Sequence, residues 1–187
     1  HLDLALPDLP TTQRRNMGVQ NQSPPQPGWI KINMDGTLDT QLQVGGAGGV
    51  ACSHLSFIGA WSKPIAGVTD PFNDETLALR EGVIFAQPRG FSHVAMEVDC
   101  LEVANLWNSH HSPRSIVKPI FDEIKERAAN FVSFSIQHVA REANYSTDLC
   151  AKHATTLSVS DVWLESCPPF LVSSFLAECN RISIIMQ

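Results

Sequence analysis

The stretch HVAMEVDCL, residues 93–101, is the part of the chain from which the fold can be worked out. Its apolar residues occupy alternate positions, which is the pattern of a buried β-strand. The same strand carries two acids two positions apart, Glu97 and Asp99, so both side chains point to one face. Like charges on one face of a buried strand are unfavourable unless another group holds them there.

The segments on either side of this strand predict an α/β order. Residues 73–90 have a helical apolar period, with Asn73 as the expected N-cap. Three alternating segments before that helix predict an antiparallel meander. The expected strands are 29–35, 44–53, 57–65, 93–99 and 132–140, and the expected helices are 73–90, 100–108, 116–131 and a last one starting near residue 144. This order predicts an α/β fold with a mixed five-stranded sheet, a three-strand antiparallel meander plus two parallel strands, flanked by helices.

Composition divides the 187 residues into three parts. Residues 1–28 are rich in Pro and Gln, which predicts a disordered linker. Residues 29–157 form the expected domain. Residues 158–187 are expected to be a C-terminal extension packed on or beside it, with a helix in the apolar segment FLVSSFLAEC. We expect a monomer, or a part of a larger polypeptide.

Charge and hydropathy exclude some classes of protein. No apolar run approaches the roughly 20 residues of a membrane helix, and the start has no signal-peptide pattern. We therefore expect an intracellular protein, nuclear or cytoplasmic, with no membrane partner. The five cysteines are scattered and form no C-x-x-C pair, which favours reduced thiols over a zinc site. The net charge of −6 argues at first against a nucleic-acid partner.

Four acids from four different elements stand among residues that are expected to be buried: Asp35, Glu75, Asp99 and Asp148. Each has an ordinary alternative, such as a strand-end turn, a partner for a helix dipole or a helix cap. A bound cation is the other interpretation, because isolated ionised carboxylates do not stay buried, and spacing alone does not choose between the two. Oxygen ligands without His or Cys select Mg²⁺ or Mn²⁺ rather than zinc.

Several motifs in the same order resemble the type-1 ribonuclease H domain of the plant retroelement, or reverse-transcriptase-like, branch. They are KINMDGT, GGAGGV, NDETLALREG, MEVDCLEVANLW and HVAREANYSTDLCAKHA, spread over residues 29–157. The resemblance implies that the four acids hold two Mg²⁺ ions, with Mn²⁺ as the alternative. Asp74, Cys100 and Thr147 are mild departures from the residues usual in the family.

The resemblance also implies further site residues. His138 lies ten residues before Asp148, the interval at which many family members carry a mobile His that assists proton transfer; the alternative is an ordinary strand residue. Candidates for substrate binding are Gly36, Thr37, Asn73, Arg141 and Asn144, of which Asn73 and Asn144 have capping as the alternative. Glycines 45–49 either let a nucleic-acid backbone approach or allow tight packing.

The implied function is a metal-dependent endonuclease that hydrolyses the RNA strand of RNA–DNA hybrids. The alternative is a domesticated retroelement-derived module that binds nucleic acid or protein with little or no catalysis. The complete set of acids favours the enzyme, whereas the acidic surface favours the module. A DnaQ-like exonuclease ranks low, because the first strand lacks an Asp-x-Glu pair. Glu97 is expected to pair with a neighbouring Lys or Arg, with direct metal binding as the less favoured reading.

Overall fold

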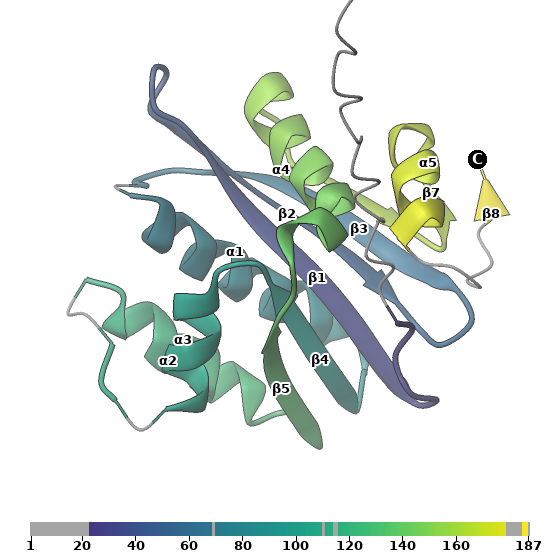
Figure 1. The fold of residues 1–187 in the computed structure, drawn as a ribbon, viewed down its shortest axis with the longest axis horizontal. Coiled ribbons are helices and arrows are strands. Elements are labelled where there is room, and N and C mark those ends of the chain that lie inside the picture. Colours follow the sequence, from purple (N-terminus) through teal and green to yellow (C-terminus); the bar gives the residue numbers. More distant parts are fainter. Residues whose placement is uncertain (1–22, 69, 110, 114–115, 179–184, 187) are drawn as a thin grey trace, which may run out of the picture.

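A mixed six-stranded sheet forms the centre of the molecule (Figure 1). The computed structural model describes residues 23–68, 70–109, 111–113, 116–178 and 185–186. Its strands are β1 (Trp29–Asp39), β2 (Val44–Cys52), β3 (Phe57–Ile65), β4 (His93–Val98), β5 (Ser133–His138) and β6 (Asp161–Leu164), with a separate pair β7 (Ser166–Cys167) and β8 (Ile185–Met186). Its helices are α1 (Pro71–Ala86), α2 (Leu101–Asn108), α3 (Lys118–Ala128), α4 (Tyr145–Leu157) and α5 (Pro169–Glu178), with 3₁₀ turns η1 (Gln87–Arg89) and η2 (Arg141–Ala143).

The strand order β5-β4-β1-β2-β3-β6 places β1 near the middle of the sheet. β1, β2 and β3 form the expected antiparallel meander, and β4 and β5 run parallel to β1. The predicted fold class is therefore confirmed. The sheet has six strands rather than five because residues 161–164 pair antiparallel with β3.

Helices cover the two faces of the sheet unequally. α1, α2 and α3 pack on one face, over a core that includes Ile32, Met34, Leu79, Met96 and Ile124. α4 lies across the other face, over β1, β2 and β3, with α5 beside it (Figure 1). A second apolar cluster, which includes Cys150, Leu171 and Phe175, fills the space between α4, α5 and β3.

Glycines of β2 bring α4 against the sheet. A Cβ added at Gly48 would meet the backbone nitrogen of Ala151 and would lie 2.5 Å from the Cβ of Cys150. A Cβ at Gly46 would lie 2.5 Å from the carbonyl oxygen of Ala151. These two glycines therefore serve close packing of a helix on a strand. They are covered by protein, so the expectation that they face a nucleic-acid backbone is wrong for this pair.

α1 begins two residues earlier than predicted. Asp70 is its N-cap, and Oδ1 of that residue accepts a hydrogen bond from the backbone N–H of Asn73 at 3.0 Å. Pro71 occupies the first helical position, where its fixed φ suits the helix and its missing N–H costs nothing. The prediction that Asn73 is the N-cap is therefore wrong. Glu75 consequently lies in the second turn of α1 rather than in the first.

Within the described ranges, the longest helix is α1 and no helix combines the length and apolarity needed to cross a bilayer.

Candidate metal centre

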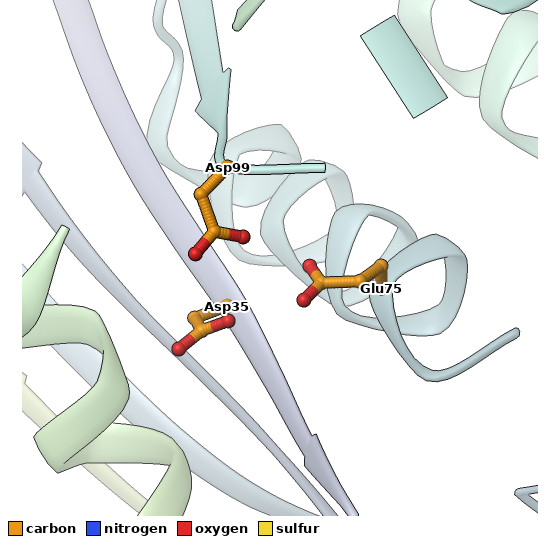
Figure 2. A group of neighbouring side chains, drawn as sticks. All are labelled: Asp35, Glu75 and Asp99. Atoms are coloured by element: carbon orange, nitrogen blue, oxygen red, sulfur yellow. The ribbon is translucent and has the colours of Figure 1, made fainter. Parts of the chain in front are cut away.

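Three carboxylates converge between the middle of β1, the end of β4 and the N-terminal half of α1 (Figure 2). Asp35 lies within β1, Glu75 in α1, and Asp99 directly after β4. One oxygen from each carboxyl lies within 4.8 Å of the others. Asp99 does not cap α2, whose N-cap position is taken by Cys100 without a side-chain capping bond. Asp99 is therefore not the cap of α2, which was the alternative to a role in metal binding.

The electrostatics of this group favour a cation. Burial is the largest cause that raises the pKa of Asp35, and the charge of Asp99 adds to it. Burial followed by the charges of Asp35 and Asp99 raises the pKa of Glu75 as well. Oδ1 of Asp35 and Oε2 of Glu75 are buried and have no hydrogen-bond partner among the described residues. Unpartnered carboxylate oxygens that face one another are the donor set that a hard divalent cation such as Mg²⁺ or Mn²⁺ prefers.

Asp148 lies next to this group but is held by another partner. It is in the first turn of α4, and its charge raises the pKa values of Asp35 and Asp99. Its Oδ2 accepts a hydrogen bond from Lys152 Nζ, one turn further along α4, at 2.6 Å. The structure thus brings three of the four expected acids together and leaves the fourth within electrostatic reach.

Two exposed residues, Arg141 and His138, lie near Asp99. The Nε of Arg141 lies 3.7 Å from Oδ2 of Asp99, and the Arg141 side chain is 81% exposed. His138 is the last residue of β5 and is exposed. Burial raises the pKa of Asp99, while Arg141 and His138 act in the opposite direction. Both residues are therefore close enough to Asp99 to influence its carboxyl group.

The remaining candidates differ in their accessibility. Thr37 is half-buried on β1, opposite Gly46 of β2. A Cβ at Gly36 would lie 2.7 Å from Oδ2 of Asp74, so α1 packs directly on this part of β1. Asn73 is buried in the first turn of α1.

Asn144 is committed to contacts within the protein. It is 2% exposed and occupies the N-cap position of α4, yet its side chain makes no capping bond. Its amide instead donates to the carbonyl oxygen of Met34 at 3.0 Å, and its Oδ1 accepts from Nδ2 of Asn33 at 3.2 Å. Asn144 thus ties the start of α4 to β1 immediately before Asp35.

Sequence reasoning missed a polar chain that lies beside the carboxylates. Glu97 accepts a hydrogen bond from Nδ2 of Asn33 at 2.9 Å and forms an ion pair with Lys31 at 3.7 Å. The parallel register sets Asn33 opposite Glu97, while Lys31 points to the same face of β1. The spacing of Lys31 and Asn33 on the first strand, opposite in phase to Ile30 and Ile32, was a signal for this arrangement. The expected cationic partner of Glu97 is therefore Lys31.

Asp74, a mild departure from the residues usual in the family, is buried beside the carboxylates. Its side chain is 1% exposed, and its Oδ1 has no hydrogen-bond partner among the described residues. Burial raises the pKa of this carboxyl to about 7. Its carboxylate lies over the backbone of Gly36 and Gly45.

Three solved structures of ribonucleases H share this architecture. RNase H1 of Halobacterium salinarum superposes with a TM-score of 0.63 at 20% identity, covering 68% of this chain and 98% of that one. The N-terminal RNase H domain of a Mycobacterium tuberculosis protein, solved as a fusion with maltose-binding protein, gives 0.62 at 19%, covering 70% and 95%. A compost-derived RNase H1, LC11, in complex with an RNA/DNA hybrid gives 0.62 at 20%, covering 69% and 98%. These likenesses define the fold as ribonuclease H-like.

The sequence matches the reverse transcriptase-like family over residues 33–154, which is more than half of the chain. The protein therefore belongs to that family. None of the curated proteins compared with it matches its sequence significantly.

Proposed function

We propose that the protein is a metal-dependent endonuclease that hydrolyses the RNA strand of RNA–DNA hybrids. The observation that carries the proposal is the convergence of Asp35, Glu75 and Asp99 from three different elements, with buried oxygens that lack partners. Membership of the reverse transcriptase-like family and the ribonuclease H-like fold support a nuclease. The hybrid in the LC11 complex supports the choice of substrate.

Asp35, Glu75 and Asp99 would hold the Mg²⁺ or Mn²⁺ ions, two in number, and Asp35 is the most central of the three in the sheet. Bound divalent ions activate a water molecule and stabilise the leaving oxygen in an in-line displacement at phosphorus. Asp148 would complete the set after leaving Lys152. An exposed i,i+4 ion pair contributes only a few tenths of a kcal/mol, so the pairing with Lys152 opposes rotation of the Asp148 side chain toward the other carboxylates only weakly.

Arg141 and His138 have proposed roles that fit their positions near Asp99. Arg141 is exposed and close to Asp99, which suits contact with a phosphate of the substrate. His138 would accept or deliver a proton from the end of β5. Gly36, Thr37 and Asn73 are proposed to sense the 2′-hydroxyl, the group by which a protein distinguishes RNA from DNA.

A binding module without catalysis is the second candidate. The observation in its favour is the ion pair that holds Asp148 on Lys152, together with the net charge of −6. Such a module would bind nucleic acid or protein with little or no catalysis.

Cleavage of a hybrid with a labelled RNA strand, in Mg²⁺ or Mn²⁺, tests the proposal. Wild type and an Asp122→Asn control, altered at an exposed acid of α3, are expected to cleave, whereas Asp99→Asn is expected to be inactive. Equal cleavage by Asp99→Asn and wild type would refute the role of Asp99. Binding of the hybrid by wild type without cleavage in either metal would favour the second candidate.

A further inference from the structure

The N-terminus of α4 is capped by a residue from α5. Asn144 occupies the N-cap position, but its side chain is engaged by β1, so the first backbone N–H groups of α4 lack a local partner. Oε1 of Glu178, at the end of α5, accepts a hydrogen bond from the backbone N–H of Ser146 at 2.9 Å. A carboxylate at this position both accepts an otherwise unmade bond and faces the positive end of the helix dipole.

Glu178 is an unusual residue for its surroundings. It is 5% exposed and is the only charged residue of α5, which packs into the second core cluster through Leu171 and Phe175. Burial raises the pKa of Glu178, while hydrogen bonds from Ser146 and Tyr145 and the charge of Lys31 act in the opposite direction. A buried acid in an apolar helix needs such partners, and here they come from α4 and β1.

A second contact fixes the same junction. The hydroxyl of Ser174, on α5, lies 3.0 Å from the hydroxyl of Ser146, and both residues are buried. The Ser174 hydroxyl also donates to the carbonyl oxygen of Leu171 within α5. The two helices are therefore joined by polar contacts at the end of α4 that faces the carboxylates.

Lys31 connects this junction to the polar chain beside the acids. Lys31 is 3% exposed, pairs with Glu97, and is close enough to Glu178 to lower its pKa. From Glu97 the chain continues through Asn33 to Asn144. Asn33 lies two residues before Asp35, and Glu97 lies two residues before Asp99. Asn144, the N-cap residue of α4, lies four residues before Asp148. The contacts of α5 thus reach every acid-bearing element except α1.

We infer that Glu178 is a positioning residue of the candidate metal centre, and that it holds α4 so that Asp148 can reach the ions. This inference rests on the proposed function. The family match ends at residue 154, so the residue that fixes the start of α4 comes from outside the matched region.

Hydrogen exchange of the full chain tests the capping contact without any assay of activity. Glu178→Ala is expected to speed exchange of the first-turn amides of α4 about tenfold, because a buried bond to a charged acceptor is lost. Glu178→Gln keeps a carbonyl oxygen at the same place and is expected to stay closer to wild type. Glu126→Ala, at an exposed acid of α3, is the matched control and is expected to leave exchange unchanged. Unchanged exchange in Glu178→Ala would overturn the inference.

Mn²⁺ binding measured by calorimetry tests the positioning role. Glu178→Ala is expected to weaken binding about tenfold in the wild-type background and to have no effect in an Asp148→Asn background, because the two residues act in series. Equal weakening in both backgrounds would identify a general structural role and overturn the inference. If Glu178→Ala does not fold, the same comparison of Mn²⁺ binding in the wild-type and Asp148→Asn backgrounds is made with Glu178→Gln and Ser174→Ala. If wild type binds Mn²⁺ but does not cleave the hybrid, the proposed hydrolysis is contradicted. The comparison of Mn²⁺ binding in the two backgrounds would still decide the role of Glu178.

Discussion

Replacing Gly48 by alanine is expected to lift α4 from the sheet. The new Cβ would lie 2.5 Å from the Cβ of Cys150 and 2.6 Å from its carbonyl carbon, whereas ordinary contact begins at 3.4 Å. The atoms in the way belong to the helix backbone or start of a side chain, so no rotamer change relieves the clash. α4 must therefore move by about 1 Å, judged from the shortfall in contact distance.

The cost of this movement follows from what α4 loses. Overpacking a dense interior costs typically 1–3 kcal/mol. The hydrogen bond from the Ser62 hydroxyl to the carbonyl oxygen of Cys150, 2.8 Å long and buried, is strained as well, which adds about 1 kcal/mol. We therefore expect Gly48→Ala to lower the free energy of unfolding by about 2–4 kcal/mol. Since Asp148 is carried by the same helix, a displacement of about 1 Å is expected to reduce cleavage by about 10²-fold.

Urea unfolding and hybrid cleavage measure the two effects, with Gly82→Ala as the control. A Cβ at Gly82, in α1, would lie 3.1 Å from the sulfur of Met34, a flexible side-chain atom, and alanine is the better helix former by about 1 kcal/mol. Gly82→Ala is thus expected to be neutral or stabilising. A Gly48→Ala protein within 0.5 kcal/mol of wild type would refute the reasoning, since the clash would then have been absorbed without moving α4.

Four further changes have distinct expected results. Glu97→Gln is expected to retain cleavage and to lower the free energy of unfolding by about 1–3 kcal/mol, because the pairing of Glu97 with Lys31 is lost. Complete loss of cleavage in a folded Glu97→Gln protein would instead assign Glu97 a direct role in the site. Asp74→Asn is expected to raise the free energy of unfolding, by at most about 4 kcal/mol above pH 7, because folding raises the pKa of this carboxyl from 3.8 to about 7 and the ionised form is disfavoured. Wild type therefore loses stability progressively as the pH rises from about 4 to 7, so thermal melts should show a clearly larger gain for Asp74→Asn at pH 8 than at pH 5, and an equal gain at the two pH values would count against this reasoning. Added Mg²⁺ at pH 8 is expected to stabilise wild type by about 1–3 kcal/mol and Asp99→Asn much less, and equal stabilisation in differential scanning calorimetry would place the ion elsewhere. Hybrid binding is expected to weaken steeply between 50 and about 200 mM salt, and a dissociation constant that stays constant in fluorescence anisotropy would exclude phosphate contacts as its source.

The elements that carry the acids could be predicted from the sequence because each is strongly patterned, whereas the choice of these four acids as a set depended on the resemblance to the ribonuclease H family. Apolar alternation fixed the strands that carry Asp35 and Asp99, and the helical period fixed the helix of Glu75. The pairing of Asp148 with Lys152 has an i,i+4 spacing and was available as a signal. The orientation of a carboxylate, toward a metal or toward a lysine, depends on side-chain rotation that spacing does not determine.

Contacts between segments far apart in the chain were harder to predict from the sequence. β6 has only four residues, and its pairing with β3 joins segments about a hundred residues apart, so no local pattern indicates it. α1 begins earlier than predicted because Asp70 as N-cap and Pro71 as first helical residue form a better helix start than Asn73. The bond from Glu178 to α4 joins two helices whose own sequences show no sign of it, since an acid at the end of an apolar helix is ordinarily solvated.

The short strand β6 also determines how the sheet ends. Without it, β3 would present nine residues of unpaired backbone at the margin of the sheet, and such a margin is a template for pairing with another molecule. β6 covers four of those residues, and its own brevity limits how far a second chain can add to it. A recombinant fragment cut at the end of the family match, residue 154, would keep every candidate metal ligand and yet expose this margin. Expression work on this protein should therefore retain residues 155–178, for solubility as much as for activity.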